Sequence, residues 1–286
     1  MGVETLIVRD TGGPQPIVYQ VPLTYRGAPL PGAEGALVGT MEHGVLGDRW
    51  VYDGPHDPVY AAQLLALIRG RVRAESSAHS DAFDDRFVGV PAPTWREDLL
   101  VRSSRVLSGE QSNTSIILDT TLTDGTPRPV IVKVFRMLAA GDNPDVVLQS
   151  ALRAAGCERV PAVVGSVRGS WPSLPPTSAP TAGPQRASGA GETAYGHVAF
   201  AQEFLPGVED AWRVASRAVE AGEDFTGPAR DLGAATAQVH RALADTHGRV
   251  PTTEAAGRAL IAGMRARYAE AVTEVDITAS DGLKEM

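Results

Sequence analysis

Hydrophobic and polar residues alternate along the amino-terminal part of the chain, in short runs that are separated by turns rich in glycine and proline. Alternation with a period of two is typical of strands that bury one face. On this basis we expect strands at residues 5–8, 17–21, 36–40 and 46–54. Helical spacing replaces the alternation from Pro58 to Gly70, so a small antiparallel sheet with one packed helix is predicted here.

The next stretch, residues 70–95, is polar and alternates in charge. It is predicted to be a connector on the surface, because it shows no apolar period. The prolines of Pro91-Ala92-Pro93 disfavour continued regular structure, so they predict a domain boundary at this point.

A strand pair is predicted between residues 107 and 136. An apolar strand at residues 116–118 is followed by the hairpin turn signal Asp124-Gly125. The return strand is expected at residues 130–135, where β-branched residues surround a single lysine.

In this return strand Ile131, Lys133 and Phe135 share one face, since side chains alternate between the two faces of a strand. A lysine is costly to bury without a partner. Two interpretations are therefore open. Either this is an edge strand that keeps the ammonium in water, or the lysine is directed at phosphates beneath the turn-forming run of residues 108–115.

Beyond this strand a helix is predicted, with Asn143 as N-cap and Pro144 in its first turn. Its expected apolar stripe consists of Val147, Leu148, Ala151 and Leu152. Strands are expected at residues 160–167 and 197–205. The low-complexity run of residues 169–193 between them is predicted to be a mobile hairpin insertion.

Helical spacing dominates the last part of the chain. We expect helices at residues 210–221, from residue 226 onward, and at residues 253–275. The side chains expected to face inward on the last two helices are Leu232, Ala235, Val239, Leu243, Ile261, Met264, Tyr268, Val272 and Val275.

Composition narrows the possible functions. The chain has 286 residues, with 26 Lys and Arg against 34 Asp and Glu, and a net charge of −8. This balance argues against binding to nucleic acid. A single cysteine, Cys157, excludes an intrachain disulfide and a cysteine-cluster metal site, and no histidine spacing fits a metal motif. Neither a signal peptide nor a membrane span is recognisable, so a cytoplasmic protein without membrane contact is expected.

Three segments carry a resemblance to a known family. The segments GEQSNTSIIL, VIVKVFR and Gly141-Asp142-Asn143-Pro144-Asp145 resemble the amino-terminal kinase lobe of actinobacterial maltokinases and related glucosamine kinases, in the aminoglycoside-phosphotransferase-like branch of the protein-kinase-like fold. The resemblance implies an α+β fold. Residues 1–92 would form an amino-terminal cap domain, residues 93–207 a nucleotide-binding lobe, and residues 208–286 the start of a helical acceptor-binding lobe.

The resemblance also implies a site. In the family the hairpin covers the ATP phosphates, the strand lysine contacts them, and a later strand leads to a hinge that binds adenine. The residues implied to bind nucleotide are Ser108, Gly109, Gln111, Ser112, Asn113, Thr114, Ser115, Lys133, Gln202, Glu203 and Phe204. For the last three, an ordinary strand end is the alternative.

The resemblance does not supply a matching carboxylate partner for Lys133. Family members often carry a glutamate two residues after the Asn-Pro-Asp sequence, where this chain has Val147. Asp145 then either pairs with Lys133 or only stabilises the helix dipole.

The predicted activity is ATP- and Mg²⁺-dependent transfer of the γ-phosphoryl group to a sugar hydroxyl, with glucosamine 6-phosphate as the expected product. Maltose 1-phosphate formation is one alternative, and a non-catalytic nucleotide-binding remnant is another. The family's His-Gly-Asp-x-His loop and later metal-binding Asp-Phe-Glu do not occur, so no catalytic residue or metal ligand is assigned and the sequence is expected to be a fragment. The expected partner is an aminosugar or maltose, bound by a monomer or weak dimer.

Overall fold

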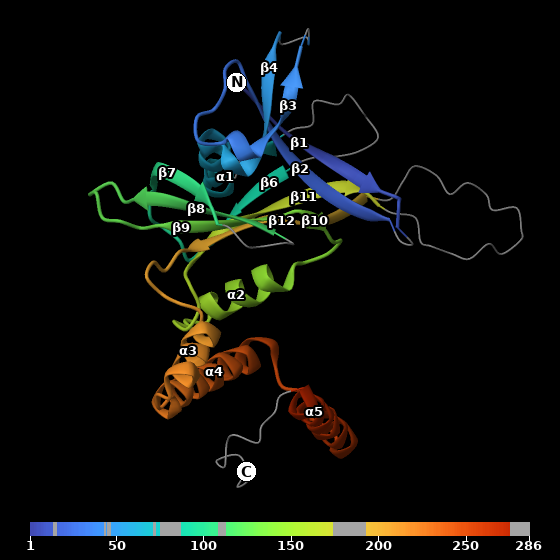
Figure 1. Cartoon of the computed structure of the whole chain (residues 1–286), viewed down its shortest axis with the longest axis vertical. Coiled ribbons are helices and arrows are strands. Elements are labelled where there is room, and N and C mark those ends of the chain that lie inside the picture. Colours follow the sequence, from blue (N-terminus) through green and yellow to red (C-terminus); the bar gives the residue numbers. More distant parts are fainter. Residues whose placement is uncertain are drawn as a thin grey trace, which may run out of the picture. The chain divides into compact units, whose positions relative to one another are not determined.

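The computed structural model describes residues 1–13, 16–42, 44, 47–70, 73–74, 87–107, 113–173 and 193–274 (Figure 1). The chain divides into two units, Met1–Thr246 and His247–Met286. The first contains both sheets and four helices among its described residues, and the second contains the last helix.

The amino-terminal sheet confirms the predicted antiparallel arrangement. Its main strands pair in the order β1-β2-β4-β3. A two-residue strand that comes from much later in the chain, β10, pairs with β2. The bounds are β1 Gly2–Asp10, β2 Ile17–Arg26, β3 Leu37–Met41, β4 Arg49–Asp53 and β10 Met137–Leu138, with short 3₁₀ turns at Glu34–Ala36 and Gly54–His56.

The second sheet has seven strands in the order β5-β6-β11-β12-β9-β8-β7, and every neighbouring pair is antiparallel. The predicted hairpin strands are confirmed as β8 and β9, with Gly125 at positive φ in the turn between them. The bounds are β5 Arg73–Ala74, β6 Phe87–Pro91, β7 Leu100–Val106, β8 Asn113–Thr121, β9 Val130–Phe135, β11 Val163–Pro172 and β12 Thr193–Glu203.

Strands β11 and β12 correct the prediction of a low-complexity insertion at residues 169–193. The first residues of that run continue β11, and Pro172 pairs with Thr193 at the start of β12. The two strands form a hairpin, as expected. Residues 174–192 lie outside the described part of the chain.

Strand β6 corrects the prediction that residues 70–95 are only a connector. Phe87–Pro91 pairs with β11 inside the second sheet. Helix α1, Pro58–Gly70, crosses this strand so closely that a Cβ built on Gly89 would lie 1.7 Å from the carbonyl oxygen of Leu67. The two sheets therefore do not separate at the Pro91-Ala92-Pro93 boundary, and the domain limits inferred from it stay a prediction.

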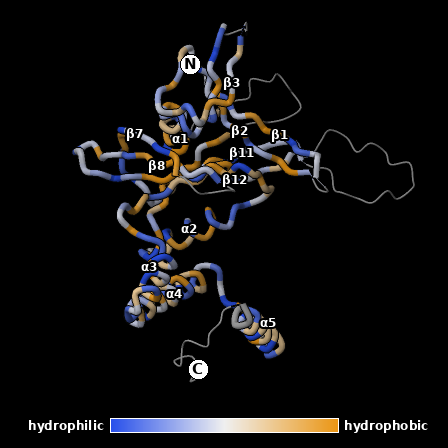
Figure 2. Tube along the Cα trace, in the orientation of Figure 1, coloured by the Kyte–Doolittle hydropathy of each residue, from blue (hydrophilic) through white to orange (hydrophobic). Residues whose placement is uncertain are grey.

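Helices lie on both faces of the second sheet (Figure 1). On one face Leu65 and Ile68 of α1 pack in the main core with Val130, Val132 and Val134 of β9. On the other face, α2 packs in a smaller core that contains Phe135 and Phe200. Figure 2 shows hydrophobic residues concentrated along these strands, as expected for a sheet buried on both faces.

Helix α2, Pro144–Ala154, begins as predicted, since the Asn143 side chain accepts a hydrogen bond from the Asp145 N–H at 2.9 Å. The predicted stripe is partly wrong. Val146 and Leu152 are buried, whereas Val147 and Leu148 are exposed. The helix is turned so that Val146 meets Phe135 and Phe200 of the sheet.

The carboxy-terminal helices are confirmed as α3 Ala211–Ala221, α4 Thr226–His247 and α5 Glu254–Glu274. Their inward faces are not confirmed, since Leu232, Ile261, Met264 and Tyr268 are all exposed. Among the described residues, no helix is both long enough and apolar enough to cross a membrane. The predicted α+β class, an amino-terminal cap followed by an antiparallel lobe and helices, is confirmed.

Candidate functional site

Lys133 lies in the interior of the second sheet, because β9 has β12 on one side and β8 on the other. This excludes the edge-strand interpretation. Directly opposite residues of antiparallel strands point to the same face, so Lys133 shares its face with Ser115 and Phe200. The lysine side chain is 24% exposed. A cation held in the middle of a sheet with little contact to water requires a nearby anion.

Asp145 supplies that anion. Its Oδ2 lies 3.7 Å from the Nζ of Lys133, although the aspartate side chain is 56% exposed. Asp145 also lies in the first turn of α2, where a carboxylate stabilises the helix dipole. The two roles that the sequence left open are therefore compatible in this geometry. An ion pair this exposed contributes little stability by itself, so it mainly orients the ammonium.

The predicted phosphate-covering loop is only partly described. Ser108, Gly109, Gln111 and Ser112 lie outside the described residues. The loop is closed by a hydrogen bond of 2.8 Å from the Leu107 N–H to the Ser115 carbonyl.

The described end of the loop divides between the two faces of the sheet. Asn113 and Ser115 pair with Phe135 and Lys133, so both lie on the lysine face. Thr114 lies on the opposite face, and its hydroxyl accepts a hydrogen bond from Arg136 Nε at 2.8 Å. The Thr114 side chain therefore does not join Lys133.

The predicted hinge lies at the end of β12. Gln202 pairs with Ile131 and thus lies on the lysine face. Its Oε1 is buried and has no hydrogen-bond partner among the described residues. The N–H groups of Glu203 and Phe204 donate to the Ala162 and Pro129 carbonyls, at 2.8 and 2.9 Å. Those two donors are used within the chain, whereas the Gln202 oxygen offers an acceptor.

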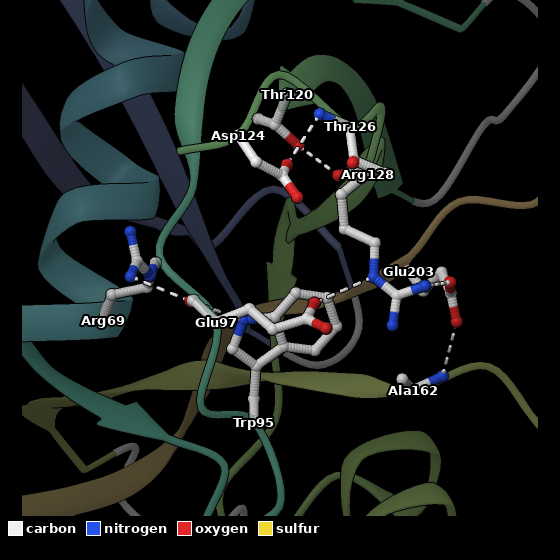
Figure 3. A network of polar contacts seen from close by, with 9 residues as sticks. All are labelled: Arg69, Trp95, Glu97, Thr120, Asp124, Thr126, Arg128, Ala162 and Glu203. Carbon is white, nitrogen blue, oxygen red and sulfur yellow. Dashed lines mark hydrogen bonds and ion pairs between the residues drawn. The ribbon is translucent and has the colours of Figure 1, made fainter. Parts of the chain in front are cut away.

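The Glu203 side chain belongs to a polar network that sequence reasoning missed (Figure 3). Arg128 donates from Nη1 to Glu203 Oε1 at 2.6 Å and from Nε to Glu97 Oε2 at 2.9 Å. The same guanidinium lies 5.3 Å from the centre of the Trp95 ring. The carboxylate of Glu203 therefore anchors the end of β12 instead of facing a ligand.

His197 connects β12 to the start of α2. Its Nδ1 accepts a hydrogen bond from the Asn143 N–H at 3.1 Å, which requires the neutral ring. Burial lowers the pKa of His197 from its ordinary value of 6.5. The Arg168 guanidinium acts in the same direction, and the Asp142 carboxylate opposes both.

This geometry predicts that stability falls in mild acid. The unfolded chain takes up a proton on His197 near pH 6.5, and the folded chain only below it. The contribution of neutral His197 is thus present above that pH and is lost as the pH falls through it to the folded pKa. Urea unfolding at a series of pH values should show this loss, and His197→Gln should remove that part of the pH dependence. An identical pH dependence in both proteins would contradict the assignment.

No group of three or more His, Cys, Asp or Glu side chains that could hold a metal ion occurs among the residues that the structure describes. Asp142 is engaged with Arg168, and Asp53 with Arg136. The Asp145 carboxylate next to Lys133 is therefore not part of a metal-binding group among the described residues.

Comparison with known proteins gives a match for the amino-terminal part of the chain. The family model of the maltokinase N-terminal cap domain matches residues 1–57, which contain β1 to β4 and end just before α1. Residues 1–57 are therefore similar to the cap domain of the maltokinases, which agrees with the cap predicted at the start of the chain.

Solved structures of glucosamine kinase are also similar. One, in complex with glucosamine, ADP and inorganic phosphate, has a TM-score of 0.43 and 20% identity, over 96% of this chain and 54% of that one. A second, crystal form A, has a TM-score of 0.42 and 19% identity, over 95% of this chain and 52% of that one. The chain thus spans about half the length of the structures it matches.

Proposed function

We propose that this chain carries the nucleotide-binding part of an ATP-dependent sugar kinase, which transfers the γ-phosphoryl group of ATP to a sugar hydroxyl. The observation that carries the proposal is the Lys133–Asp145 pair, at 3.7 Å, on an interior strand between the loop that ends at Asn113 and the strand that ends at Glu203. The match of residues 1–57 to a maltokinase cap supports it independently.

In this proposal Lys133 neutralises phosphate charge. Asp145 holds the ammonium on the face that also carries Asn113 and Ser115, so the cation is already in place when the nucleotide binds. A preorganised charge stabilises the transferring group without reorganisation during the reaction. The backbone N–H groups of the loop would add an anion-binding concavity.

Gln202 would face the base. Its Oε1 is buried without a hydrogen-bond partner among the described residues, so the amide would turn toward the ligand to accept a hydrogen bond from the exocyclic amino group of adenine. The Glu203 and Phe204 N–H groups are already committed, so the other base contact would come from a backbone group beyond them. The predicted Mg²⁺ finds no ligand set among the described residues, and we derive no step through it.

Glucosamine is the proposed acceptor, with maltose as the alternative. The cap match names the maltokinases, whereas the segment TYRGAPL and the run that ends in RWVYDGP resemble the glucosamine-kinase group. A chain that binds nucleotide without catalysis is the remaining alternative, because the His-Gly-Asp-x-His pattern does not occur in the sequence.

A titration tests the proposal. The purified chain, titrated with ATP in the presence of Mg²⁺ in a calorimeter, is expected to show saturable binding to one site. A chain that is folded but shows no heat with ATP would overturn the proposal.

A second measurement separates the alternatives. We expect no ADP release from this chain with glucosamine or maltose, since its sequence lacks the His-Gly-Asp-x-His pattern whose aspartate would accept the sugar proton. Robust sugar-dependent ADP release would show that catalytic groups were missed. The DNA sequence beyond codon 286 then distinguishes the two alternatives. An in-frame His-Gly-Asp motif supports the kinase, and a stop codon supports the non-catalytic alternative.

A further inference from the structure

Arg136, the residue directly after β9, joins the amino-terminal sheet to the predicted phosphate loop. Its Nη2 donates to both carboxylate oxygens of Asp53, at 2.7 and 2.6 Å, and its Nε donates to the Thr114 hydroxyl at 2.8 Å. Asp53 is the last residue of β4 in the amino-terminal sheet. Thr114 is the second residue of β8, next to the loop. One guanidinium therefore spans from the cap to the root of the loop.

The partial burial of this contact makes it more than a surface ion pair. The side chains of Arg136 and Asp53 are 23% and 28% exposed, so water screens their attraction incompletely. A charge-assisted hydrogen bond is also about twice as strong as one between neutral groups. The guanidinium is therefore held firmly by the cap when it donates to Thr114.

The main chain around Arg136 is held from the same side. The Gln20 N–H donates to the Arg136 carbonyl at 2.9 Å, and the Gln20 Nε2 donates to the Phe135 and Val198 carbonyls at 2.6 and 2.5 Å. Gln20 is only 3% exposed. Since buried carbonyls are costly to leave unpaired, this residue of β2 holds the end of β9 and the middle of β12 in place.

We propose that the amino-terminal sheet fixes the described root of the predicted phosphate loop, Thr114 and Ser115, through Asp53 and Arg136. Arg136 is then a positioning residue, because it acts through Thr114 on the opposite face from Lys133. Fixing Thr114 fixes its neighbour Ser115, which lies on the lysine face and closes the loop through the Leu107 N–H. The consequence for nucleotide affinity rests on the proposed function, whereas the effect on the loop does not.

Amide hydrogen exchange on the full chain without nucleotide tests the structural part. Asp53→Asn keeps the shape of the side chain but removes its charge. The Leu107 amide should then exchange roughly tenfold faster, because the loop root opens more often. Glu209→Gln is the matched control, since it removes a carboxylate that Arg217 binds through two nitrogens at 2.8 and 2.5 Å, in a helical part of the chain. Unchanged exchange at Leu107 in Asp53→Asn would overturn the proposal.

ATP titration tests the functional part. Asp53→Asn and Thr114→Val should each weaken ATP binding roughly tenfold, and the double variant should be no weaker than either, because both break one relay. Thr114→Ser, which keeps the hydroxyl, should restore the affinity. If the wild-type chain binds no ATP, the proposed function is wrong. The exchange rate of the Leu107 amide would still show whether Asp53 holds the root of the loop. If it binds ATP and Asp53→Asn binds equally well, the relay does not position the nucleotide site.

Discussion

Lys133→Met is expected to weaken ATP binding by about ten- to a hundredfold, while the free energy of unfolding changes little. A charge-assisted contact to phosphate contributes about 1.5–3 kcal/mol, which corresponds to that range. Methionine keeps an unbranched stem of similar length, so packing against Phe200 and Ser115 is retained. Calorimetric titration with ATP and urea unfolding of the same samples measure the two effects.

The neighbouring carboxylate provides the comparison for this variant. Asp145 is 56% exposed, so Asp145→Asn should reduce the affinity only a few-fold, by loosening the ammonium. Arg102→Met, which removes a cation from strand β7 of the same sheet, should bind ATP like the wild type. Wild-type affinity in Lys133→Met would show that this lysine is only a strand residue, and the proposed nucleotide site would be wrong.

Gly89→Ala is expected to destabilise the fold by about 3 kcal/mol or more. A Cβ at this position would lie 1.7 Å from the carbonyl oxygen of Leu67 and 2.5 Å from its carbonyl carbon. Both are backbone atoms of α1, so they cannot rotate away as a side chain would. The helix cannot withdraw cheaply either, because its Leu65 and Ile68 are fully packed in the main core. The midpoint of urea unfolding should therefore fall steeply.

Gly233→Ala is the control for this change. No atom of another segment lies within 4 Å of a Cβ at Gly233, which lies inside α4. Alanine is a better helix former than glycine by about 1 kcal/mol, so this variant should be equally stable or slightly more stable. Wild-type stability in Gly89→Ala would mean that α1 does not pack as closely on β6 as the structure describes.

Gly89 also explains why β6 was not predicted. The strand follows a long charged run and ends in Pro91, so the local pattern indicated a connector. Gly89 itself weakens any strand signal, because glycine is common in turns. Its actual purpose, the close approach of α1, depends on a segment about twenty residues earlier and leaves no local periodicity.

The helices show a related limit. Spacing predicted where α2, α4 and α5 lie, and capping predicted Asn143 correctly. Periodicity defines an apolar face but not the surface that covers it. Thus Val147 and Leu148, expected inside, are exposed, while Val146 is buried against Phe200.

The candidate site, too, could be predicted from the sequence only in part. The face of Lys133 followed from the two-residue period of a strand, and the structure places Gln202 and Ser115 on that face through sheet pairing. The Arg128–Glu203 and Arg136–Asp53 contacts join residues 75 and 83 positions apart. Nothing in the local sequence of either partner identifies the other, because such pairs exist only after the sheets have formed.

The pairing of β2 with residues near Arg136 has a consequence for biosynthesis. Gln20 emerges from the ribosome early, but its carbonyl partners, Phe135 and Val198, are 115 and 178 residues downstream. At about 5–20 residues per second, the later partner is made roughly 10 to 35 seconds after the strand that needs it. The first half of β2 must therefore wait, unpaired along this edge, until most of the second sheet has been translated, and chaperones have that interval in which to bind it.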